Sequence, residues 1–195
     1  GTAYPSVAVA SRTLPYAISV RRVLIMSALS YGLYLFYWFY LTWKQYREHT
    51  RAEAFPVGHA LALMVPIYNL FRLHAHMRSF KELMQNAGLA TTINAGWAVM
   101  LVLISNALGV VAFRLAGGFS GAEDLTLKTA VAIGALNFIS IAVVAGVLIQ
   151  VQGNLNRYWS NVANAQLVHA RIGVGEVAFG LIGGIFWLNT LAALG

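Results

Sequence analysis

The chain lacks cysteine and has few charges, with six acids and 13 lysines and arginines among 195 residues. Without a thiol it forms no disulfide, no thiolate nucleophile and no cysteine-ligated iron–sulfur cluster. Charged residues make up 10% of the sequence and hydrophobic residues 59%, whereas a typical soluble domain is about 25% charged. This composition excludes an ordinary water-soluble surface and indicates an integral membrane protein.

Motifs for catalysis and metal binding are also missing. There is no GxxxxGK[ST] phosphate loop, no HExxH pair and no zinc-ligand spacing. Acids that couple proton or ion movement inside membrane segments are absent, since Glu123, Asp124 and Glu176 stand at expected helix starts, where they complement the helix dipole. We therefore expect a protein that is not an enzyme, with no catalytic residue, no metal site and no predicted cofactor.

Five apolar segments follow a stretch, residues 1–20, that is expected to form an extended tail without the order of a signal peptide. Because a backbone in lipid must satisfy its own hydrogen bonds, these segments are expected to be helices. The fold class is therefore an all-α integral membrane protein, with one domain over residues 21–195 and four to five membrane helices. The fourth helix is expected to continue into the polar stretch that follows it. The segments are Val23–Trp43, Val57–Leu73, Gly96–Leu115, Thr129–Val151 and Val174–Leu194.

One or two amphipathic helices are expected to lie at the membrane surface. In Leu70–Ala87 the large apolar residues recur at helical spacing on one face, while basic and polar residues occupy the rest. Lys44–Arg51 is a shorter stretch of the same kind. The apolar face of the longer helix consists of Leu70, Leu73, Met77, Phe80 and Met84.

Basic residues near the segment ends predict orientation in a bacterial inner membrane. Two arrangements satisfy the rule equally well: five spans with the N-terminus inside, or a re-entrant segment 57–73 with the N-terminus outside. Both place residues 74–94 and 153–172 in the cytoplasm. Both also place the Glu123–Asp124 turn and the C-terminus outside.

The aromatic stretch YGLYLFYWFYLTWKQY at 31–46 has nine aromatic side chains in 16 positions. A membrane-interface belt needs fewer, so we predict that Tyr34, Trp38, Phe39 and Trp43 contact another protein subunit. A flat pigment or quinone is the alternative occupant of this surface. The residues that would bind it are His59, Tyr34 and Trp38.

The stretch at 31–48 also resembles VPIYNLFRLHAHMRSFKE at 65–82. Each begins with Gly or Pro, continues with Tyr and bulky apolar residues, and ends in a basic amphipathic tail. Two interpretations stay open, an ancient duplication and convergence on the same interfacial chemistry.

Small residues four positions apart predict close helix packing in the later segments. Uncharged polar residues in these segments are expected to bond neighbouring helices, and a transport path through Asn106, Asn137 and Arg114 is the alternative. The packing residues are Ser105 with Gly109, Ala142 with Gly146, and Gly180 with Gly184.

The chain resembles a family of uncharacterised bacterial membrane proteins, the domain-of-unknown-function 4234 family. Four motifs carry the resemblance: YGLYLFYWFYLTWKQ at 31–45, VPIYNLFRL at 65–73, LNRYWSNV at 155–162 and GEVAFGLIGGIFWL at 175–188. The resemblance implies a small multispanning membrane protein and brings no activity or catalytic residues.

The leading functional hypothesis is a non-catalytic accessory subunit of a larger bacterial membrane complex, respiratory or photosynthetic. Its expected partners are membrane lipids and other membrane subunits, and nucleic acid is excluded because the basic residues flank apolar segments. The alternative is a small oligomeric transporter or channel. The third hypothesis is a subunit that binds a pigment or quinone.

Overall fold

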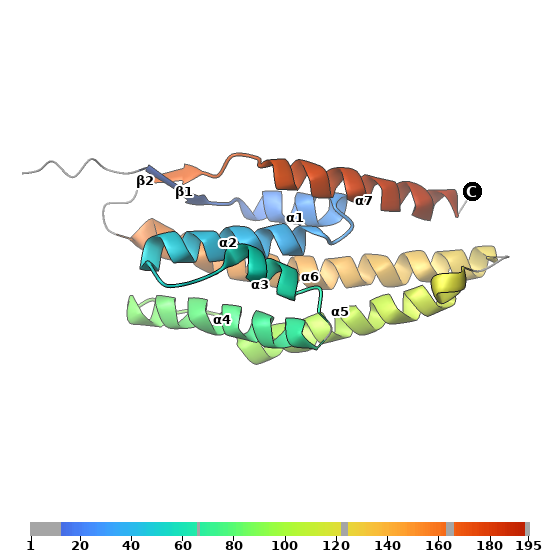
Figure 1. Cartoon of the computed structure of the whole chain (residues 1–195), viewed down its shortest axis with the longest axis horizontal. Helices are drawn as coiled ribbons and strands as arrows, with labels where there is room; N and C mark the ends of the chain where they lie inside the picture. The colour runs from blue at the N-terminus through green and yellow to red at the C-terminus, as the bar shows by residue number, and fades with distance from the viewer. Residues whose placement is uncertain (1–12, 66, 122–124, 163–165, 194–195) are drawn as a thin grey trace, which may run out of the picture.

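Three of the five apolar segments form long single helices, α5 (Ala95–Leu115), α6 (Leu127–Asn161) and α7 (Val174–Ala192). Each is long and apolar enough to cross a membrane. The computed structural model describes residues 13–65, 67–121, 125–162 and 166–193, in which seven α-helices lie along one long axis (Figure 1). The predicted all-α, multi-pass architecture is confirmed at this level. The described residues contain three candidate spans, fewer than the four to five membrane helices predicted.

Helix α6 continues beyond its apolar part, as predicted. Its 35 residues correspond to about 52 Å at 1.5 Å per residue, whereas the hydrocarbon core of a bilayer is about 30 Å thick. The helix therefore extends beyond the membrane at one end. The sequence locates this extension in the polar stretch QGNLNRYWSN that ends the helix at Asn161.

The segment Val23–Trp43 is not one span, which corrects the first predicted membrane helix. It forms α1 (Val20–Leu29) and α2 (Tyr34–Thr50), which fold back on each other as a hairpin (Figure 1). At the turn, Tyr31 and Gly32 have φ values of 56° and 85°, in the left-handed region that favours glycine. The Ser30 hydroxyl accepts a hydrogen bond from the Tyr34 backbone N–H at 2.8 Å and starts the second helix.

The second apolar segment also reverses direction. It contains the short helix α3 (Pro56–Ala62) and the first part of α4 (Tyr68–Asn86). A helix of seven residues covers only about 10 Å, so this segment does not cross a bilayer. Neither of the two arrangements left open by the sequence agrees in full: the structure has the re-entrant segment 57–73 of the second, but that arrangement also required a single span at Val23–Trp43. Pro66 lies outside the described residues.

The two hairpins repeat one another with an offset of 34 residues. Tyr34 begins α2 and Tyr68 begins α4, so the two similar stretches start their helices at matching positions. The matched pair Tyr46 and Phe80 have ring centroids 5.5 Å apart. Figure 1 shows α2 and α4 running in the same direction. The sequence similarity therefore corresponds to a structural repeat.

The apolar face of α4 is covered by protein, which corrects the predicted contact with headgroups. Leu73, Met77, Phe80 and Met84 are at most 1% exposed. The Phe80 ring contacts the Tyr46 ring of α2, and α4 also packs against α5. The helix is amphipathic, as predicted, but its apolar face belongs to the bundle core.

A two-stranded parallel sheet closes the end of the bundle where α6 finishes (Figure 1). Strand β1 (Thr13–Ala17) pairs with β2 (Gln166–His169). The last part of the predicted extended tail is therefore a paired strand, which the sequence did not indicate. Residues 1–12 of that tail and the Glu123–Asp124 turn lie outside the described residues.

Candidate functional site

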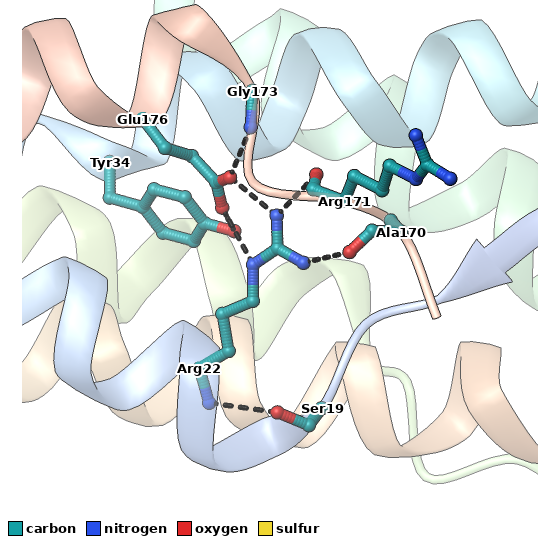
Figure 2. A network of polar contacts seen from close by, with 7 residues as sticks. All are labelled: Ser19, Arg22, Tyr34, Ala170, Arg171, Gly173 and Glu176. Carbon is teal, nitrogen blue, oxygen red and sulfur yellow. Dashed lines mark hydrogen bonds and ion pairs between the residues drawn. The ribbon is translucent and has the colours of Figure 1, made fainter. Parts of the chain in front are cut away.

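A buried ion pair fixes α7 to the first hairpin. Glu176, in the first turn of α7, is fully buried, and Arg22 reaches it from α1 (Figure 2). Arg22 Nε donates to Glu176 Oε1 at 2.9 Å, and Nη2 pairs with Oε2. The Tyr34 hydroxyl donates to Oε1 at 3.2 Å and the Gly173 backbone N–H donates to Oε2 at 2.9 Å. Glu176 thus caps its helix, as predicted, and also forms an ion pair that the sequence did not reveal.

Each oxygen of the Glu176 carboxylate and each nitrogen of the Arg22 guanidinium has a hydrogen-bond partner within the chain. Besides Glu176, the Arg22 guanidinium donates to the carbonyls of Ala170 and Arg171, and the latter bond is 2.8 Å long (Figure 2). Both carboxylate oxygens and all three guanidinium nitrogens therefore have partners. Because these partners all lie within the chain, we interpret the network as a structural connection between α1, α2 and α7.

Glycines let α7 approach the hairpin closely. A Cβ at Gly183 would lie 2.3 Å from the Leu29 carbonyl oxygen and from Ser30 backbone atoms. A Cβ at Gly175 would lie 2.4 Å from the Tyr37 ring. Only glycine fits at these two positions, which the spacing of small residues did not single out.

The four aromatic residues predicted to contact a partner are buried in the chain itself, which corrects that prediction. Tyr34, Trp38 and Phe39 have no exposed surface and Trp43 is 6% exposed. Trp38 Nε1 donates to Gln152 Oε1 on α6 at 2.8 Å. These side chains form the core between the hairpins and α6, and none of them offers a surface to a second protein.

His76 on α4 is fully buried inside this aromatic core. Its ring lies 4.2 Å from that of Phe39 and 4.8 Å from that of Phe80, measured between centroids. Its Nε2 lies 3.2 Å from the Thr42 hydroxyl. Burial, together with the charges of His59 and Arg72, holds the pKa of His76 well below its ordinary value. His76 is therefore a neutral core residue.

His59, the candidate ligand for a flat cofactor, has partners within the chain. Its ring lies 4.6 Å from that of Trp43, and it accepts a hydrogen bond from Arg72. Burial lowers the pKa of His59, and the Arg72 charge lowers it further. Within the described ranges, no three His, Asp or Glu side chains are arranged to hold a metal ion.

The polar end of α6 joins the other elements. Asn154 contacts the α4–α5 connection, where its Oδ1 accepts from the Thr92 backbone N–H at 3.2 Å. Asn156 Nδ2 donates to the Ile18 carbonyl at 2.7 Å. His49 Nε2 lies 2.8 Å from the Tyr158 hydroxyl. This extension is thus a scaffold that holds the sheet, α2 and α5 together.

Most of the predicted packing residues do not pack within the chain. Ser105 does, because its hydroxyl lies 2.6 Å from that of Ser140 across α5 and α6. A Cβ added at Gly109, Gly146 or Gly184 would meet nothing within 4 Å. Gly180 has only the Met26 side chain nearby, at 3.9 Å, and Ala142 is exposed.

Among the open grooves between the described helices, three bear on these predictions. The first, about 530 Å³, runs between α1 and α7 beside Gly180 and Gly184. The second, about 580 Å³, lies between the start of α4, α5 and α6, and contains Asn106. The third, about 320 Å³, is lined only by apolar surface of α2, α3 and α7, including Phe36 and Tyr40.

The residues proposed for a transport path do not meet in one groove. Asn106 lines the second groove, whereas Asn137 is half-buried elsewhere on α6 and Arg114 is exposed at the end of α5. Neither Asn137 nor Arg114 lines any of the three grooves.

Comparison of the chain with models of protein families, with curated proteins and with solved structures finds no match. The resemblance described above therefore depends on its four motifs alone.

Proposed function

We propose that the chain is a non-catalytic accessory subunit of a larger bacterial membrane complex and contacts a partner helix through the groove between α1 and α7. The observation that carries this proposal is the pair Gly180 and Gly184. Both lie along this groove; from outside the local helix backbone, a Cβ at Gly180 would meet only the Met26 side chain, at 3.9 Å, and one at Gly184 nothing within 4 Å.

The glycines favour a protein helix over lipid as the occupant. Glycine in a helix costs about 1 kcal/mol relative to alanine, and at Gly175 and Gly183 close contacts within the chain account for it. Gly180 and Gly184 have no such contact. Acyl chains adapt to larger side chains, whereas a second helix backbone approaches closely only over small residues.

The rest of the groove suits the same partner. Its walls include Met26, Leu29 and Trp187, and nearly all of its surface is apolar. Along the outer side of α7, Leu181 is 69% exposed and Leu188 also 69%. This face replaces the aromatic stretch 31–46 as the proposed contact with membrane subunits, while lipid covers the other apolar faces.

The test compares the complex formed by the wild-type chain with that formed by a Gly180→Leu/Gly184→Leu variant. A tagged full-length chain is purified from its native membranes in mild detergent and analysed by native mass spectrometry. We expect a hetero-oligomer of fixed stoichiometry for the wild type and a free chain for the variant. Gly153→Leu on α6 is the matched control, because a Cβ there also meets nothing within 4 Å.

Two outcomes would contradict the proposal. One is a wild-type chain that purifies only as a monomer or homo-oligomer, which would favour the transporter or channel hypothesis. The other is a hetero-oligomer that forms equally well with both leucines present, which would move the contact to another face. A visible absorbance band on the pure chain would instead support the pigment hypothesis.

The same proposal gives an orientation in the bacterial inner membrane. Arg114 and Lys128 flank the α5–α6 connection, whereas the other described lysines and arginines lie on α1 to α4, in the last turns of α6 or before α7. Basic residues favour the cytoplasmic side. We therefore propose that the sheet and the ends of α2, α4 and α6 are cytoplasmic, with the C-terminus outside. We also retain the resemblance to the domain-of-unknown-function 4234 family as a proposal.

A further inference from the structure

The groove between α4, α5 and α6 combines a polar floor with apolar walls. Ser105, halfway along the candidate span α5, lies on its lining beside Asn106. Asn69, from the first turn of α4, contributes a second amide. Side chains such as Leu103 and Phe113 supply apolar surface on either side. The polar groups therefore lie at mid-depth in a segment able to cross the membrane.

The two amides of this groove lack hydrogen-bond partners, unlike its hydroxyls. The Ser105 and Ser140 hydroxyls bond each other at 2.6 Å and reach each other's backbone carbonyls. The side-chain carbonyl oxygen of Asn69 is buried without a partner. Among the described residues, the Asn106 amide makes no hydrogen bond. Such groups are costly in an apolar environment, and lipid chains cannot satisfy them.

The charge of the lining restricts the ligand. The residues that line this groove include no lysine, arginine, histidine, aspartate or glutamate. A phosphate head would therefore lack a counter-charge here, and an ammonium head would lack a carboxylate. The Asn106 amide is exposed in the groove, and an uncharged hydroxyl pairs with either its donor or its acceptor.

We propose that this groove binds an uncharged membrane lipid with a hydroxyl-bearing head, as in a diacylglycerol or a hydroquinone. The hydroxyl of the lipid head bonds the exposed Asn106 amide, which offers both a donor and an acceptor. The lipid chain lies against the apolar walls and leaves through the open side of the groove. The volume of about 580 Å³ falls in the range of small-molecule sites.

Gly109 provides a way to block this site without disturbing the fold. It lines the groove, and a Cβ at this position meets nothing within 4 Å. A leucine at 109 would fill the space that the lipid head occupies. Gly146 on α6 has the same open surroundings but does not line this groove, so Gly146→Leu is the matched control.

The experiment measures photolabelling of the full-length chain in vesicles by three lipids with the same diazirine-bearing acyl chain. The three lipids are a diacylglycerol, a hydroquinone and a phosphatidylcholine, so they differ in the head group. We expect the diacylglycerol, the hydroquinone or both to label peptides of α4, α5 and α6 that line the groove, in preference to phosphatidylcholine. Whichever of these two lipids gives the stronger labelling identifies the class of lipid that supplies the hydroxyl. Gly109→Leu should reduce this labelling about tenfold, and Gly146→Leu should leave it unchanged.

Equal labelling by phosphatidylcholine would overturn the proposal, because the groove would then hold bulk lipid. The same conclusion follows if Gly109→Leu labels like the wild type. If neither hydroxyl lipid labels the groove and Asn106→Cys reacts with a water-soluble maleimide, the groove holds water and the proposal is wrong. Thermal unfolding of each variant verifies that lost labelling does not reflect lost structure.

Discussion

Thr42 on α2 and His76 on α4 occupy matching positions of the two hairpins, 34 residues apart, and are in hydrogen-bond contact at 3.2 Å. The Thr42 hydroxyl donates to the Trp38 carbonyl at 2.9 Å. Its proton is thus used, so His76 donates from Nε2 to Thr42 Oγ1. The other ring nitrogen, Nδ1, is buried without a partner, and the imidazole is neutral.

This arrangement predicts loss of stability in acid. Below pH about 6.5 the unfolded chain protonates His76, whereas the folded chain, in which its pKa is lowered, does not. The unfolded state then binds more protons, so falling pH favours unfolding, by up to about 1.4 kcal/mol per pH unit for one group. Thermal unfolding of the purified chain should therefore occur at lower temperature at pH 5 than at pH 8.

Substitutions of His76 and of the nearby His74 test whether His76 is the source of this pH dependence. His76→Gln keeps an amide donor for Thr42 but removes the titrating group, so the pH dependence should become shallower. His74, two residues away, is exposed, and His74→Gln should retain the wild-type slope. An unchanged slope in His76→Gln would show that His76 is not the group responsible.

The buried pair of Arg22 and Glu176 predicts a large mutational effect. Removing the carboxylate leaves the guanidinium of Arg22 and the Tyr34 hydroxyl without their partner in a site where Glu176 is fully buried. Breaking a buried pair from one side costs roughly 3–5 kcal/mol. Glu176→Ala should therefore lower the free energy of unfolding by about this amount, measured by denaturation in micelles.

An exposed ion pair in the same chain is the control. Arg78 and Glu82 on α4 are four residues apart, with side chains 69% and 54% exposed. Exposed pairs contribute little, so Glu82→Ala should unfold like the wild type. Equal effects of the two substitutions would mean that the Glu176 site is open to water.

The sequence predicted α5, α6 and α7 closely because their apolar length alone decides them. It failed at Val23–Trp43, where the composition is equally apolar but Ser30, Tyr31 and Gly32 reverse the chain. A hydropathy profile does not detect such a turn. Gly32, two residues after Ser30, was the available signal, since glycine permits the positive φ that the turn requires.

The predicted partner contact at 31–46 was wrong for a related reason. A surplus of aromatic residues at 31–46 indicated a contact surface, but the second hairpin lies against it and buries Trp38 and Phe39. Only the similarity between 31–48 and 65–82 could have suggested this pairing. The ion pair between Arg22 and Glu176 joins residues 154 positions apart, and no local pattern predicts such a contact.

Two adjacent glycines on α7 should respond in opposite ways to substitution. Alanine at 183 would place its Cβ 2.3 Å from backbone atoms of Leu29 and Ser30, which cannot move without opening the turn. Overpacking of this kind costs roughly 1–3 kcal/mol or more. Alanine at 184 meets nothing within 4 Å. Denaturation in micelles should show Gly183→Ala clearly less stable than the wild type and Gly184→Ala equal or more stable. Equal stability of the two variants would contradict the close approach of α7 to the turn.

The final prediction concerns which end of the bundle faces the cytoplasm. The ends of α4 and α6 lie together at one end, and the 3-10 turn Gly118–Ser120 lies at the other (Figure 1). Basic residues concentrate toward the first end, which should therefore be cytoplasmic.

Because the chain has no cysteine, single thiols at exposed positions report without background. In intact bacteria, a membrane-impermeant maleimide should label Ser120→Cys and spare Gln85→Cys and Ser160→Cys, which should react only after the cells are permeabilised. Labelling of Gln85→Cys with protection of Ser120→Cys would invert the orientation. Labelling of Gln85→Cys and Ser160→Cys from opposite sides would contradict the hairpin fold itself, since both helices would then end on different faces of the membrane.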